Sequence, residues 1–124
     1  MSYEKLLQEY DKDCIIEERN MTNDGLYCDG VAWINKNLTS AEKTCILAEE
    51  LGHHFTTVGD ILDITDDANA KQEHIARVWA YNKLLNLDMI LDAIKQGYHE
   101  PYEIAEYLEV SEQFLKEYIE YLNL

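Results

Sequence analysis

The chain has 124 residues, 47% of them hydrophobic, and a formal net charge of -15 at pH 7, which fits one soluble domain with a buried core. Nucleic-acid affinity depends chiefly on Lys and Arg neutralising phosphates, so this charge argues against direct nucleic-acid binding. It suits a basic protein partner or simply a well-solvated surface. Because there is no apolar stretch of roughly 18 residues and no signal-peptide pattern, we expect a cytoplasmic protein without a membrane span.

The first part of the chain predicts a short helix and a small sheet. Apolar residues recur at helical spacing between Ser2 and Tyr10. Turn-forming residues at 23–25 and at Asp29-Gly30 then separate three segments with strand character. The expected strands are residues 14–18, 26–28 and 31–35. We expect these strands to form an antiparallel sheet.

Two long helices are predicted to follow the sheet. The first begins at Thr39 or Ser40, since Glu42 completes a capping box with Thr39, and it ends near residues 56–59. A polar connection at 63–70 leads into the second helix, which we expect from about Asn69 to Asn86. Its expected buried face is formed by apolar and small residues, namely Ile75, Ala76, Val78, Trp79, Ala80 and Leu85.

The C-terminal part has the outline of a helix-turn-helix unit. Helices are predicted at 87–96, at 101–108 and from the cap Ser111 to Leu122. The last helix carries three glutamates and a single lysine, which would repel DNA phosphates, so a packing or protein-binding unit is favoured over a DNA reader. The predicted domains are a core at 1–86 and this helical unit at 87–124, packed on the core.

Residues 48–54, AEELGHH, are the most informative stretch of the sequence. In the zinc-helix signature H-E-x-x-H, two histidines lie one helical turn apart and the glutamate after the first polarises the attacking water. Here Glu49 stands at the first histidine, Glu50 at the general base and His53 at the second ligand, while Gly52 allows close packing nearby. A solvated Glu–His pair on a helix surface is the simpler interpretation of the same spacing.

A third ligand is predicted on the second long helix. Glu73 lies on nearly the same face as the expected buried residues, where a charge should be paired or bound, and gluzincins take their third ligand from such a downstream helix. An ion pair with Arg77, four residues later, fits the spacing equally well. His54 and His74 are further candidate ligands, although each is more often a partly exposed polar residue.

Three blocks of the sequence, taken in order, resemble the ImmA/IrrE family of metallo-endopeptidases of phages and mobile elements. They are residues 47–56, 71–80 and 103–111, and the resemblance covers most of the chain. It implies a zincin-like α+β core in which the motif helix and a glutamate of the next helix hold one zinc ion. Some members cleave a helix-turn-helix repressor. By position, Glu50 would be the general base, and His53 and Glu73 would be ligands.

Glu49 departs from the family pattern. A carboxylate in place of an imidazole takes the ligand set from one negative charge to two, which makes a metal-bound water less acidic and softens the preference for zinc. Without any cation, the converging carboxylates would raise one another's pKa. We therefore expect Zn²⁺ held by Glu49, His53 and Glu73, with another divalent metal such as Mn²⁺, or no metal, as alternatives.

The expected function is a metal-dependent endopeptidase that cleaves a phage or mobile-element repressor. The alternative is a catalytically degenerate relative that binds a repressor or another regulator without cutting it. A transcription regulator acting through the last helix is a third interpretation, disfavoured by the acidic surface. The sequence leaves the scissile bond and the oligomeric state open.

Overall fold

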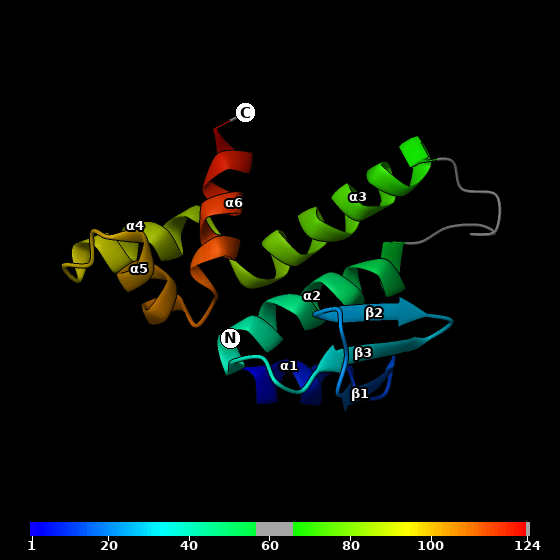
Figure 1. Cartoon of the computed structure of the whole chain (residues 1–124). Helices are drawn as coiled ribbons and strands as arrows, with labels where there is room; N and C mark the ends of the chain where they lie inside the picture. Colours follow the sequence, from blue (N-terminus) through cyan, green and yellow to red (C-terminus); the bar gives the residue numbers. More distant parts are fainter. Residues whose placement is uncertain (57–65, 124) are drawn as a thin grey trace.

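A computed structural model of the chain describes residues 1–56 and 66–123, which form an α+β fold of helices and a three-stranded mixed sheet (Figure 1). In chain order the elements are α1 (Tyr3–Tyr10), β1 (Ile15–Arg19), β2 (Gly25–Cys28), β3 (Val31–Asn35), α2 (Ser40–Thr56), α3 (Asp66–Leu84), α4 (Leu87–Lys95), α5 (Pro101–Leu108) and α6 (Glu112–Leu122). None of these described helices combines the length and the apolar character needed to cross a membrane.

The sheet has the strand order β1-β3-β2. β2 and β3 form the expected antiparallel hairpin, with Asp29 and Gly30 both at positive φ in its turn. β1 pairs with β3 in parallel, so the prediction of an antiparallel sheet is wrong for this strand. The physical reason is the connection at 20–24, which carries the chain past one strand position to the far edge. β3 then returns between β1 and β2, in the direction of β1.

The helix that carries the motif, α2, begins at the predicted capping box. The Thr39 N–H donates to Glu42 Oε1 at 3.0 Å, and the Glu42 N–H donates to Thr39 Oγ1 at 3.2 Å. The helix packs against α1, β2 and β3 and, along another side, against α3. Leu47, Ala48 and Leu51 are fully buried there. Local capping and a buried apolar side therefore fix where the motif lies.

The second long helix differs from its expected bounds. α3 begins at Asp66 rather than Asn69 and ends at Leu84, while the predicted end of α2 beyond residue 56 and the connection at 63–65 lie outside the described residues. Ile75 was expected in the core but is 49% exposed, because the buried face is centred on Ala76 and Ala80.

The C-terminal helices share one core with the rest of the chain. The Ser111 hydroxyl accepts the Phe114 N–H at 3.1 Å, as predicted for the cap of α6. Phe114 and Tyr118 of α6 pack their rings on Tyr81 of α3, with ring centroids 5.2 and 5.6 Å apart. The buried cluster therefore includes residues on both sides of residue 86. The boundary at residue 86 and the helix-turn-helix character of this part stay predictions.

Gly52 sets how closely α2 approaches α3. A Cβ placed on Gly52 would overlap the carbonyl oxygen of Ala76 and lie 2.9 Å from its Cα, so the two helices touch through their backbones at this point. Only glycine permits that approach. The close packing expected at Gly52 is confirmed.

Gly52→Ala should therefore destabilise the fold by about 1 to 3 kcal/mol through overpacking. Helix propensity alone would change the stability in the opposite direction, by about 1 kcal/mol. Urea unfolding of the two proteins at one pH measures the difference. An unchanged or increased free energy of unfolding in the variant would show that the helices are not in backbone contact.

Candidate functional site

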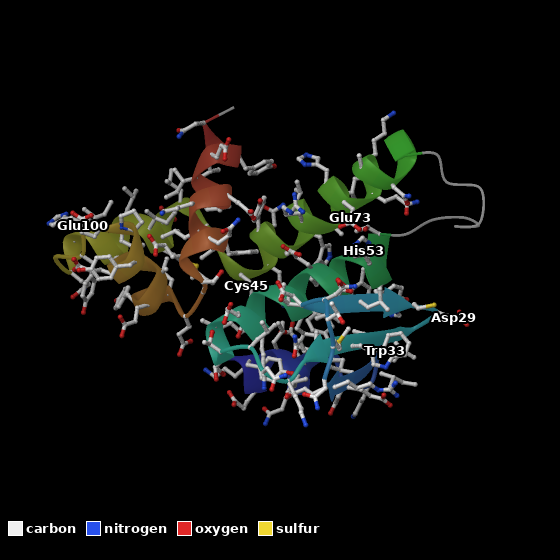
Figure 2. All side chains as sticks on the ribbon, in the orientation of Figure 1. Asp29, Trp33, Cys45, His53, Glu73 and Glu100 are labelled. Carbon is white, nitrogen blue, oxygen red and sulfur yellow. The ribbon has the colours of Figure 1, made fainter. Side chains whose placement is uncertain are left out.

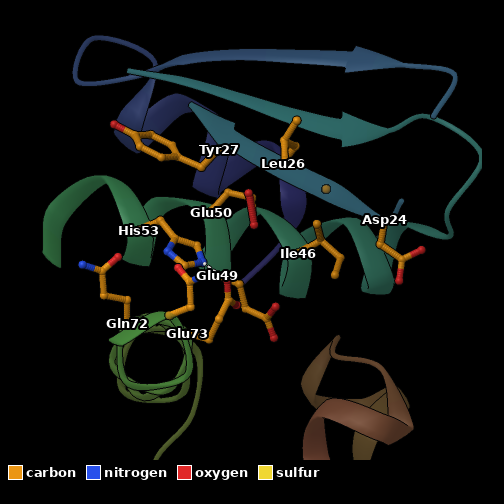
Figure 3. Close-up of a pocket in the computed structure, with 11 residues that line it drawn as sticks. Asp24, Leu26, Tyr27, Ile46, Glu49, Glu50, His53, Gln72 and Glu73 are labelled. Carbon is orange, nitrogen blue, oxygen red and sulfur yellow. Dashed lines mark ion pairs between the residues drawn. The ribbon is translucent and has the colours of Figure 1, made fainter. Parts of the chain in front are cut away.

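The four predicted site residues line one pocket of about 380 Å³ between β2, α2 and α3. Figure 3 shows Glu49, Glu50 and His53 on α2 and Glu73 on α3, with the edge strand β2 along the opposite side. The structure therefore brings together residues that are up to 24 positions apart in sequence (49 to 73). Their catalytic and ligand roles stay predictions.

His53 and Glu73 meet across the two helices. His53 Nε2 lies 3.3 Å from Glu73 Oε1, and the His53 side chain is largely buried whereas that of Glu73 is exposed. Two atoms that bind a tetrahedral zinc ion at 2.0–2.1 Å are themselves about 3.3 Å apart. The pair therefore has the separation of two ligands of one ion, which is also the separation of a His–Glu ion pair. The alternative ion pair between Glu73 and Arg77 is not formed among the described residues.

Glu49 is directed to a different partner. Its Oε1 atom lies 3.9 Å from Nε of Arg77, on α3. Burial raises the pKa of Glu49 to about 7, and the nearby Arg77 charge opposes that rise. The Arg77 Nε–H group is itself buried without a hydrogen-bond partner. The contact is thus a loose ion pair rather than a charge-assisted hydrogen bond.

Glu50 is the most buried carboxylate in the pocket. Its exposed fraction is 8%, and its Oε2 atom is buried without a hydrogen-bond partner. Burial, followed by the negative charges of Glu49 and Glu73, raises the pKa of Glu50 to about 8. Glu50 therefore holds a proton at neutral pH unless a cation stands nearby.

His54 and His74, the alternative ligands, do not line the pocket. Tyr27 of β2 accepts the Gly30 N–H at 3.0 Å through its hydroxyl oxygen, which lies 2.7 Å from Nδ1 of His54. The hydroxyl proton is therefore available to a neutral His54, whose ring links the end of α2 to the hairpin. The His74 ring packs near Tyr121 of α6 instead, at 6.3 Å between centroids. Tyr27, which lines the pocket, was not singled out by the sequence analysis.

Two of these side chains are placed as a divalent cation requires. His53 and Glu73 have the spacing of two ligands, and a cation would stabilise the anionic form of Glu50, whose Oε2 atom has no hydrogen-bond partner. Glu49 is paired with Arg77 instead. Among the side chains that the structure describes, no three of His, Cys, Asp or Glu form a group that could hold a metal ion. The donor set of one nitrogen and carboxylate oxygens suits zinc or manganese.

The buried carboxylates predict that metal-free protein loses stability as pH rises. Because the Glu50 pKa is raised from 4.5 to about 8, the folded chain binds more protons than the unfolded chain in this interval, and the free energy of unfolding falls across it. Glu50→Gln should remove a large part of this fall, of the order of 3 kcal/mol.

Urea unfolding from pH 5 to 8 with a chelator present tests this expectation. Gln72→Ala changes a residue of the same pocket that carries no ionisable group, and should leave the slope as it is. An identical slope in wild type and Glu50→Gln would show that Glu50 titrates normally.

The comparison with known proteins agrees with this architecture at the level of the family. The family described as the IrrE N-terminal-like domain matches residues 12–120, which is most of the chain and includes the whole pocket. No curated protein matches the chain. The resemblance drawn from the sequence is thereby confirmed for the family, while the variant motif is a feature of this chain. The chain belongs to the peptidase family of the IrrE N-terminal-like domain.

Proposed function

We propose that this protein is a metal-dependent endopeptidase. The observation that carries the proposal is the 3.3 Å separation of His53 Nε2 and Glu73 Oε1 beside the unpartnered, buried carboxyl group of Glu50. Membership of a peptidase family supports it. The ion, zinc or manganese, would be held by His53 and Glu73, with Glu49 as the third ligand.

In the proposed reaction, Glu50 moves the proton. A bound zinc ion supplies a Lewis acid that polarises a peptide carbonyl and acidifies a water molecule. Next to a cation the carboxylate form of Glu50 is favoured, and its Oε2 atom can accept the proton of the attacking water. The burial that raises the pKa of Glu50 then helps it to deliver this proton to the leaving nitrogen.

The pocket supports a protein segment as the substrate. β2 is an edge strand beside the site, and an edge strand offers N–H and C=O groups to an extended peptide. Asp24, Glu49 and Glu73 make the lining acidic, which favours a basic segment. The proposed substrate is a helix-turn-helix repressor of a phage or mobile element, as the family resemblance implies.

Replacing Glu50 by Gln should lower peptide hydrolysis by about a hundredfold or more while substrate binding is retained, because only the proton transfer is removed. Chromatography and mass spectrometry of a candidate repressor incubated with zinc-loaded protein measure the fragments. Gln72→Ala is the matched control and should cleave at a rate close to that of the wild type. Full activity of Glu50→Gln would contradict the role assigned to Glu50.

The second candidate function is binding of a repressor or another regulator without cleavage. The Glu49–Arg77 ion pair favours it, because this pair withholds the third ligand. A single experiment, in which the protein is mixed with a candidate repressor, distinguishes the two functions. Chelator-sensitive fragments support the peptidase, and an intact complex that co-migrates in gel filtration with or without chelator supports the binding protein.

A further inference from the structure

We propose that Arg77 competes with a divalent cation for the carboxylate of Glu49, and so sets the metal affinity of the site. The inference rests on the metal site proposed above. It concerns a residue that no part of the zinc-helix signature includes, and it assigns to Arg77 a positioning role rather than a catalytic one.

Two residues of α2 face two residues of α3, which places the Glu49–Arg77 contact beside the proposed metal site. Glu49 and His53 are four residues apart on α2, and Glu73 and Arg77 are four residues apart on α3, so each pair lies on one face of its helix. The helices lie side by side and run in opposite directions (Figures 1 and 2). His53 therefore faces Glu73 at 3.3 Å, and Glu49 faces Arg77 at 3.9 Å. A cation at the first pair would lie one helical turn from the guanidinium.

The Glu49–Arg77 contact is weak enough to be exchanged. Its atoms are 3.9 Å apart, the Arg77 side chain is 41% exposed, and the Arg77 Nε–H makes no hydrogen bond. Solvent screens such a pair. A divalent ion already held by His53 and Glu73 offers Glu49 a stronger partner at shorter distance.

The Arg77 guanidinium also borders a second pocket, which we assign as its position once Glu49 turns away. Arg77 and Glu49 both line a second pocket of about 440 Å³, next to the first, which Glu117 of α6 also lines. Glu117 does not line the first pocket, and its carboxylate is the partner that we assign to Arg77 once Glu49 turns toward the cation.

Arg77 lowers metal affinity in two separable ways. Its positive charge repels a cation whatever Glu49 does, whereas competition for the carboxylate requires Glu49. A double-mutant cycle isolates the second effect, because the interaction between two residues is what remains after the single effects are subtracted.

The test is a zinc titration, by competition with a fluorescent chelator, of full-length wild type, Arg77→Met, Glu49→Gln and the double variant. We expect Arg77→Met to bind zinc about fivefold more tightly than the wild type, and to gain much less in the Glu49→Gln background. Arg77→Lys keeps the charge and should stay close to the wild-type affinity. Thermal unfolding without metal shows whether each variant is folded, and Arg77→Gln replaces Arg77→Met if the latter is not.

Equal zinc affinity of wild type and Arg77→Met would overturn the inference and leave the peptidase proposal standing. An equal gain in both backgrounds would also overturn it, since the effect would then be charge repulsion alone. If neither wild type nor Arg77→Met binds zinc, the inference and the proposed metal site both fail.

Discussion

The backbone contact between Gly52 of α2 and Ala76 of α3 is the constraint on which the site depends. It holds the two helices at a distance that no side chain at position 52 would allow. At this distance and in this register, His53 reaches Glu73 and Glu49 reaches Arg77. The capping box fixes where α2 begins, and the packing of its buried side against the sheet fixes the position of this helix relative to β2 and β3.

The pocket brings together more carboxyl groups than its own cations can neutralise. Glu50 is buried without a partner, Glu49 has a loose ion pair, and Glu73 is opposite a histidine. Burial accordingly raises the pKa of Glu49 and Glu50 to about 7 and about 8. A divalent ion would relieve this repulsion and restore the basic form of Glu50, so the same feature that destabilises the metal-free pocket prepares it for a cation. The positive charge of Arg77 already offsets part of this repulsion at Glu49.

Local signals in the sequence were sufficient to predict where several helices and turns lie. The Thr39–Glu42 capping box, the Asp29-Gly30 hairpin turn and the Ser111 cap each depend on residues a few positions apart, and the structure has all three. The parallel pairing of β1 was not predictable in this way, because it depends on the path of residues 20–24 across the sheet. The partners Glu49–Arg77 and Tyr27–His54 were missed for a related reason: they depend on how separate elements face one another.

The metal content of the protein is the measurement that decides whether His53 and Glu73 form the proposed metal site. Elemental mass spectrometry would compare untagged wild type, purified without chelator, with His53→Ala, Glu73→Ala and the control His54→Ala. We expect about one zinc or manganese ion per chain in the wild type and in His54→Ala, and loss of the ion in the other two variants. No bound metal in the wild type, even after reconstitution, would show that His53 and Glu73 do not form a metal site, and would favour a protein that binds its partner without cutting it.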